Sequence, residues 1–232
     1  MGNDRVATGI DAFDEELEGG FPPNSTVIVM GEEGTGKDAL VNKFIYHGLE
    51  EGEEAMYVTL DGAPGDVRGD AEYMGWDFTE YDDHVVFVDG YSWQGGGSDA
   101  EFALEGLSDL NQMNMTFTDA LNSLSDGQKR VTINSASTML LYTDATSAVK
   151  FLQVVGAKAS SSGGCLLITL EEGMHDDQTI STINHVADGV LKTRVDGDQN
   201  QISIERMNQT EHTREWMDLN VDSDEGNIDI EK

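Results

Sequence analysis

The chain has 232 residues, 38% of them apolar, which is enough for one α/β domain with a proper core but short for two full domains. It carries 13 Lys plus Arg against 45 Asp plus Glu, a formal net charge of −32. Holding a nucleic acid by its phosphates requires clusters of Lys or Arg, and no stretch of this chain is basic. The composition therefore disfavours direct nucleic-acid binding and attachment to an acidic membrane surface.

The sequence also lacks membrane and export signals. No run of about 18 apolar residues occurs, and the start MGNDRVATGI has neither the basic flank nor the apolar stretch of a signal peptide. We therefore expect a cytoplasmic protein. The acidic residues are spread between apolar runs along the whole chain, which favours a solvated acidic surface of the halophilic kind. The single Cys165 lies in an apolar run and is expected in the core.

Short apolar runs alternate with longer stretches of helical periodicity, the pattern of βαβ units on a mostly parallel sheet. Most of these runs are apolar on both faces, which is typical of strands covered by helices on both sides. The expected strands are Thr26–Met30, Ala55–Leu60, Val85–Val88, Val131–Asn134, Cys165–Leu170 and Val190–Val195. The expected helices are Ala39–Glu50, Asp66–Met74, Ala100–Ser125, Thr143–Ser161 and Gln178–Val186.

The pattern changes after Val195. The pair Gly197-Asp198 separates two strand-like runs and predicts a β-hairpin, and Trp216–Val221 is a candidate for a last strand. The sequence thus predicts one α/β domain over residues 1–221 that ends in a β-hairpin. Residues 222–232 form an acidic tail that we expect to fray.

The sharpest chemical signal follows the first expected strand and has the form G-x-x-x-x-G-K. Its residues are Gly31, Glu32, Glu33, Gly34, Thr35, Gly36 and Lys37. A strand that leads through a Gly-rich loop into a helix can aim backbone N–H groups and the positive end of the helix at phosphate oxygens. We call residues 31–37 the phosphate loop; the alternative, a Gly-rich surface turn, is disfavoured by this strand–loop–helix context.

The sequence around the phosphate loop contains further motifs. TGID and LEGGFPPNS precede it, AMYVTLDGAPGDVRGDAEYMGWDF follows it, and HVADGVLKTRVDGDQNQISIERMNQTEH lies near the end. With these motifs the chain, from about Ala7 to Val221, resembles the KaiC-like and RadA-like ATPases of the RecA superfamily. The resemblance implies a RecA-like P-loop NTPase fold, with a twisted, mostly parallel sheet and helices on both faces. It also implies ATP and Mg²⁺ as ligands, and a ring or filament with nucleotide between subunits.

By the same resemblance, residues 31–37 with Asp38 and Ala39 would bind the nucleotide. Two positions depart from the family at its metal site. Asp38 stands where the family has a Thr or Ser whose hydroxyl binds Mg²⁺, and Asn134 stands where it has an acidic residue. A carboxylate at position 38 would repel phosphate unless a divalent cation lies between them. Asp38 could then ligate Mg²⁺ while Asn134 hydrogen-bonds it, or both positions could have drifted together.

The residues at the catalytic positions also differ from those of the family. Asp61 and Gly62 replace a pair of Glu that orients or activates the attacking water, which leaves Asp61 as the candidate base beside the catalytic Lys37. Arg206 and Asn208 correspond to a Lys and an Arg that reach the neighbouring subunit's γ-phosphate, so one cation remains there. Glu171 and Glu172 occupy the position where the family senses the γ-phosphate, although acidic surface is the commoner explanation in so acidic a chain.

Three functions are compatible with these residues. The first is an ATP-binding regulatory protein with slow or absent hydrolysis, whose ATP-bound state is recognised through self-association or a partner in signalling. The second is a pseudo-ATPase scaffold that no longer binds nucleotide. The third is a RadA-paralogue-like recombination or repair accessory protein, which the lack of a basic stripe disfavours. We favour the first, because the phosphate loop is intact while the catalytic positions are altered.

Overall fold

The computed structural model describes residues 5–222 and 226–231. In this part of the chain ten strands form one sheet, in the order β10-β9-β8-β7-β1-β6-β5-β2-β3-β4. The strands are β1 (Thr26–Gly31), β2 (Glu54–Thr59), β3 (Val85–Asp89), β4 (Phe102–Ala103), β5 (Lys129–Asn134), β6 (Gly164–Glu171), β7 (Gly189–Asp196), β8 (Gln199–Met207), β9 (Met217–Asp222) and β10 (Asn227–Glu231).

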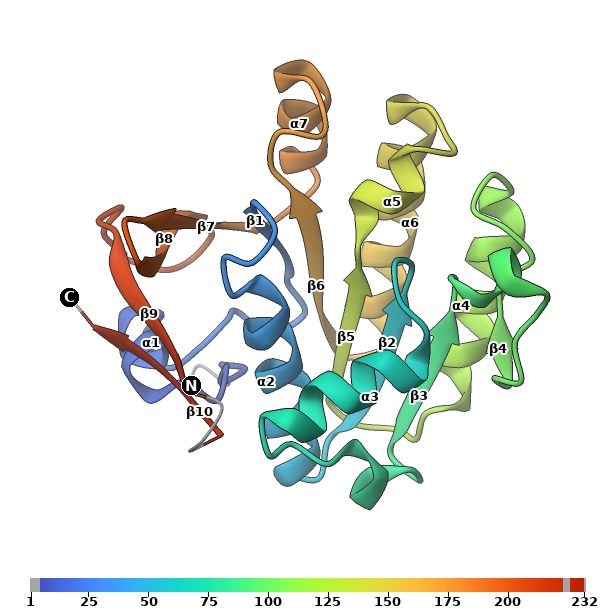
Figure 1. Cartoon of the computed structure of the whole chain (residues 1–232), viewed down its shortest axis with the longest axis horizontal. Helices are drawn as coiled ribbons and strands as arrows, with labels where there is room; N and C mark the ends of the chain where they lie inside the picture. Colours follow the sequence, from blue (N-terminus) through green and yellow to red (C-terminus); the bar gives the residue numbers. More distant parts are fainter. Residues whose placement is uncertain (1–4, 223–225, 232) are drawn as a thin grey trace.

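Helices cover both faces of this sheet (Figure 1). The α-helices are α1 (Asp11–Glu16), α2 (Lys37–Glu50), α3 (Pro64–Tyr73), α4 (Leu110–Ser123), α5 (Ala136–Leu140), α6 (Ala145–Ser161) and α7 (Asp177–Asn184). Two short 3-10 helices are η1 (Phe78–Tyr81) and η2 (Ser92–Gly95). From β7 through β1 to β4 all neighbouring strands are parallel, while β7 to β10 pair antiparallel. The predicted fold class is confirmed.

The strand β1 lies between two hydrophobic cores. Val27 and Val29 join the core beneath α1, α2 and α3, whereas Ile28 and Met30 join the core beneath α4, α5, α6 and α7. This follows from the period of two along a strand, which sends alternate side chains to opposite faces. A strand between two helical layers therefore needs an apolar residue at every position. Packing on both faces fixes the carboxyl end of β1 in place.

The expected helix Ala100–Ser125 is wrong in its first third. Phe102 and Ala103 pair with β3 as the edge strand β4, and α4 begins only at Leu110. The carboxylate of Asp109 accepts hydrogen bonds from the N–H groups of Asn111 and Gln112, so this residue caps the helix and sets its start. The short helices α1 and α5 were not expected either.

The predicted hairpin is confirmed, because β7 and β8 pair antiparallel on either side of Gly197, whose φ is +66°. The expectation that the acidic end frays is wrong for Asn227–Glu231, which pairs with β9. Ile228 and Ile230 of this strand are buried in the core beneath α1 and α2, while the acidic residues between and after them face outward. Alternation of Ile with acidic residues therefore forms a strand at the sheet edge. Residues 223–225 and 232 lie outside the described part.

Within the described ranges, no helix is both long enough and apolar enough to cross a membrane.

Candidate functional site

The phosphate loop leaves the sheet at the end of β1 and enters α2 (Figure 1). Gly36 precedes the helix in the left-handed region, with φ +87°, and a Cβ there would lie 2.8 Å from Cδ2 of Leu219. A Cβ on Gly31 would lie 2.0 Å from Oγ1 of Thr193. Both glycines are therefore required, because β7 and β9 pack directly against the loop.

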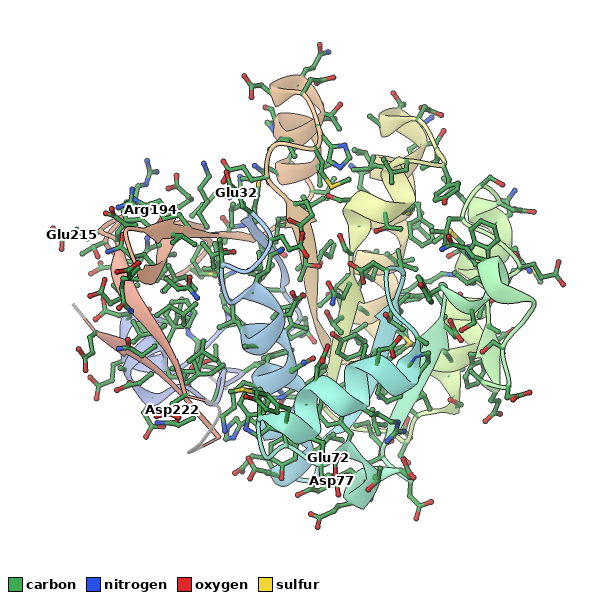
Figure 2. All side chains as sticks on the ribbon, in the orientation of Figure 1. Glu32, Glu72, Asp77, Arg194, Glu215 and Asp222 are labelled. Atoms are coloured by element: carbon green, nitrogen blue, oxygen red, sulfur yellow. The ribbon has the colours of Figure 1, made fainter. Side chains whose placement is uncertain are left out.

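Two side chains hold the loop in place from inside. The buried Thr35 donates a hydrogen bond from Oγ1 to the backbone oxygen of Glu32 at 2.7 Å, and its Oγ1 lies 2.6 Å from Oγ1 of Thr193. Glu32 itself is exposed, and Figure 2 shows it at the turn between β1 and α2. The loop is thus anchored to β7 while its outer edge stays open to solvent.

Lys37 is almost fully buried, and its ammonium group makes an ion pair that sequence reasoning missed. Its Nζ lies 2.5 Å from Oε1 of Glu171 and donates to the backbone oxygen of Glu32 at 3.2 Å. Glu171 ends β6 and pairs in register with Gly31 of β1. The only signal for this contact was the parallel pairing of those two strands, which brings their carboxyl ends to one place.

This arrangement fits a chain of phosphates. The first turn of α2 presents backbone N–H groups that the helix does not use, and the helix dipole favours an anion at that end. Space is open beside the loop tip, since a Cβ on Gly34 would meet no atom within 4 Å. A Lys ammonium carries three donors, so the contacts of Lys37 with Glu171 and Glu32 leave one donor for a phosphate oxygen.

The two expected metal-site residues lie together. Asn134 donates from Nδ2 to Oδ1 of Asp38 at 3.2 Å and to the hydroxyl of Tyr57 at 3.2 Å, and its Oδ1 accepts from Oγ1 of Thr169 at 2.5 Å. Asn134 therefore has both ends of its amide occupied and holds one oxygen of Asp38, whose second oxygen stays available. In the described part of the chain, no three His, Cys, Asp or Glu side chains lie close enough to hold a metal ion among themselves.

The candidate base Asp61 follows β2 and lies near Asp38. Partial desolvation, the negative charge of Asp38 and that of Glu171 all raise the pKa of Asp61, while Lys37 lowers it. Burial and the charge of Asp38 also raise the pKa of the phenol of Tyr57. Asp38 and Asp61 therefore repel each other across a shared space.

That space is a pocket of about 290 Å³ between α2, α3 and the ends of β2 and β5, here called the acidic pocket. It is lined by Asp38, Asn42, Tyr57, Asp61, Gly62, Asp66, Val67, Asp70 and Asn134. Asp61, Asp66 and Asp70 are exposed at its rim, whereas Asn42, Tyr57 and Asn134 are buried. The structure thus brings the predicted base and both predicted metal-site residues to one pocket beside the phosphate loop.

Arg206 lies elsewhere. Its Nη2 donates to the backbone oxygens of Asn184 and Ala187, both at 2.6 Å, at the end of α7. It lines a second cavity, of about 600 Å³, together with Met30 and Lys192, on the face of the sheet opposite α2. Within one chain the structure therefore does not bring Arg206 to the phosphate loop.

Comparisons with known proteins agree with this geometry. A family model described as "ATPase: KaiC" matches residues 6–231. A UPF0273 protein of Methanopyrus kandleri is 31% identical over 202 residues, which cover 84% of this chain and 79% of the relative. One of Pyrococcus furiosus is 28% identical over 220 residues, which cover 90% of this chain and 87% of the relative.

A solved structure has the same fold. The crystal structure of a KaiC-like protein from Pyrococcus horikoshii superposes with a TM-score of 0.80, over 98% of this chain and 99% of the other, at 22% identity. At that identity the likeness supports the fold alone, whereas the family model covers nearly the whole sequence. The chain therefore belongs to the KaiC family of ATPases, and it carries the P-loop fold of the RecA superfamily.

Proposed function

We propose that this protein is a cytoplasmic switch that binds ATP with Mg²⁺ at the phosphate loop and hydrolyses it slowly or not at all. Its ATP-bound state would be recognised in signalling through self-association or by a protein partner. The observation that carries the proposal is an intact phosphate loop, with a buried Lys37, beside catalytic positions that hold Asp38, Asn134 and Asp61.

In this proposal the backbone of residues 31–37 and the first turn of α2, including Asp38 and Ala39, hold the phosphates. Lys37 contacts them through its remaining donor. When bound, Mg²⁺ neutralises phosphate charge and so offsets the repulsion between ATP and Asp38. Asp38 would hold the metal with the oxygen that Asn134 leaves free, and Asn134 would fix the orientation of that carboxylate.

Slow hydrolysis follows from the residues available as a base. Gly62 carries no side chain, so of the two residues at the family's catalytic positions only Asp61 could accept a proton from water. Its carboxylate is one methylene shorter than the Glu expected there, and a misplacement of about 1 Å can cost about 100-fold in rate. A long-lived ATP state suits a switch better than an energy-converting enzyme.

Arg206 can act only on a neighbouring subunit in this proposal. Nη2 is held by backbone oxygens, but Nε is buried without a hydrogen-bond partner in the described structure. In a head-to-tail assembly this guanidinium would reach the neighbour's nucleotide. Light scattering in molar KCl with Mg²⁺ and ATP tests this: a larger species that Arg206→Ala abolishes supports the role, and a strictly monomeric protein contradicts it.

A second candidate is the scaffold that binds no nucleotide. The observation in its favour is the ion pair between Lys37 and Glu171, which neutralises the loop's cation without a ligand. In that case the loop would be a structural element, and partners would recognise another surface.

Calorimetric titration with ATP in molar KCl, with and without Mg²⁺, decides between the two candidates. We expect binding that requires Mg²⁺ and is lost in Lys37→Ala but kept in Lys150→Ala, a change of an exposed Lys on α6. The double variant Asp38→Thr with Asn134→Asp should hydrolyse ATP faster than the wild type. Absence of binding in every condition would refute the switch and favour the scaffold.

A further inference from the structure

We propose that the outer face of α4 and α6 is the contact surface of a dimer of this chain that forms without nucleotide. Acidic residues occupy 45 of the 232 positions, so about three would be expected among the 17 residues of α6. This helix has none, whereas every other described α-helix of eight residues or more has at least one. The surface of α6 therefore departs from the acidic surface of the rest of the chain.

The helix α4 continues this neutral surface. On the side that meets α6, Asn114 and Thr118 accept hydrogen bonds from Nζ of Lys158 at 2.9 and 2.5 Å, so this ammonium group is already held within the chain. The one acid of α4, Asp119, lies about 100° further round the helix than Thr118. Among the described residues that line the groove between the two helices, Lys150 alone is charged.

The same face exposes apolar side chains beside that groove. Met115 of α4 is 66% exposed and Val154 of α6 is 44% exposed. The groove has a volume of about 330 Å³, and Leu110, Phe151 and Val154 are among its lining residues. Met115 lies one turn beyond Asn111, which also lines the groove. In a twofold contact the projecting side chain of each copy meets the groove of the other, and a flexible Met side chain adapts to such a gap.

Charge favours a second copy over other partners. The net charge of −32 means that most of the surface would repel another copy, whereas a neutral face avoids that repulsion. Exposed amides such as Asn111 and Gln153 can both donate and accept hydrogen bonds, so they can pair across a twofold axis. An acidic partner would find only Lys150 to pair with, since Lys158 is already bound. A basic partner would be attracted to the acidic faces instead.

The size of this face predicts a weak dimer. With 14 residues in α4 and 17 in α6, the helices are about 21 and 26 Å long and together cover a width of about 20 Å. A contact over this face would bury on the order of 1,000 Å² in the two copies together, which is the lower end of the range for specific interfaces. We therefore expect a dissociation constant in the micromolar range.

The experiment is sedimentation equilibrium of the nucleotide-free chain in molar KCl, which screens the acidic surface. We expect a concentration-dependent dimer. Val154→Asp should raise its dissociation constant about tenfold or more, because a twofold contact buries the new charge in both copies. Tyr73→Asp is the matched control: it adds the same charge at an apolar side chain that is 74% exposed on α3, on the opposite face of the sheet. The control should dimerise like the wild type.

Disulfide cross-linking keeps the test decisive if thermal melting shows that Val154→Asp is unfolded. The natural Cys165 is buried, so a cysteine introduced at the surface is the accessible one. An equal mixture of Met115→Cys and Val154→Cys chains should give a disulfide-linked dimer under mild oxidation. A mixture of Met115→Cys and Tyr73→Cys chains should not.

Three outcomes would overturn the proposal: a chain that stays monomeric without nucleotide, a dimer that Val154→Asp and Tyr73→Asp weaken equally, or equal cross-linking in the two mixtures. An ATP titration of the same samples separates this proposal from the proposed function. A dimer without ATP binding would refute the switch alone, and ATP binding by a chain that is monomeric without nucleotide would refute the dimer alone. Arg206→Ala should leave the dimer intact, because Arg206 is held at the end of α7 and not on this face.

Discussion

The ion pair between Lys37 and Glu171 predicts that Glu171→Gln tightens ATP binding. The carboxylate of Glu171 lies 2.5 Å from the ammonium group that a phosphate would contact. Glu171 also places a negative charge beside the first turn of α2, where the phosphates would lie. The substitution keeps an acceptor for Lys37 but removes both the competing charge and the repulsion.

The size of the effect follows from the environment of this pair. The side chain of Lys37 is 2% exposed and that of Glu171 is 22% exposed, so water screens the interaction only in part. Two unit charges about 4 Å apart interact by about 1 kcal/mol in water and about 4 kcal/mol near a protein surface. We therefore expect Glu171→Gln to make the free energy of ATP binding more favourable by about 1–2 kcal/mol, which lies within that range. This corresponds to a roughly 5- to 30-fold lower Kd.

Calorimetric titration with ATP and Mg²⁺ measures this, with Glu172→Gln as the control. Glu172 is the next residue and loses the same charge, but its side chain is 45% exposed and its Oε1 lies 3.9 Å from Nζ of Lys192. We expect little change in the control. Unchanged or weaker binding in Glu171→Gln, or equal tightening in both variants, would refute the idea that Glu171 competes with the nucleotide for Lys37.

Three further predictions concern stability. Arg130 is buried, and its Nε lies 2.8 Å from the carboxylate of Glu53. Arg130→Met should therefore lower the free energy of unfolding by about 3–5 kcal/mol in denaturant titrations. Adding Glu53→Gln should recover part of this loss. Gly36→Ala should cost about 1–2 kcal/mol in the same assay, because of the positive φ and the contact with Leu219; no change would contradict the required glycine. The raised pKa of Asp61 means that its contribution to stability is present at low pH and is lost as pH rises through the folded-state pKa. With a chelator present, Asp61→Asn should therefore raise Tm at neutral pH and flatten its fall with pH, and a lower Tm would contradict this.

The parallel part of the fold was predictable because its signals are local and repeat along the chain. An apolar run such as Thr26–Met30 can only be buried on both faces, and this places helices on both sides of the sheet. The elements near the edge of the sheet were harder to predict. Phe102 and Ala103 form a strand only because β3 offers a free edge, and α4 starts where Asp109 caps it. The strand depends on tertiary pairing with β3, which the local sequence does not contain, whereas the cap at Asp109 is a local signal that the sequence analysis missed.

The candidate site likewise has a part that could be predicted from the sequence and a part that could not. The phosphate loop is contiguous in sequence, so its residues and the need for Gly36 could be inferred directly. The neighbourhood of Asp38, Asn134 and Asp61 followed from the family resemblance, since parallel strands end at one edge. The pairing of Lys37 with Glu171 depends on side-chain position at the end of β6, which periodicity does not contain.

The charges around the phosphate loop explain why the proposed function includes a cation. Lys37 is a single positive charge, and Glu171 already neutralises it, while Asp38 and Asp61 add negative charge on the other side. A polyanion such as ATP therefore meets a site whose own side chains oppose it, although the helix end and the loop backbone favour it. Added positive charge is the physical means to reverse that balance, and Mg²⁺ on the nucleotide would supply it. Asp38, in place of a Mg²⁺-binding hydroxyl, adds to this negative charge, so the proposed switch predicts that ATP binding is strictly dependent on Mg²⁺.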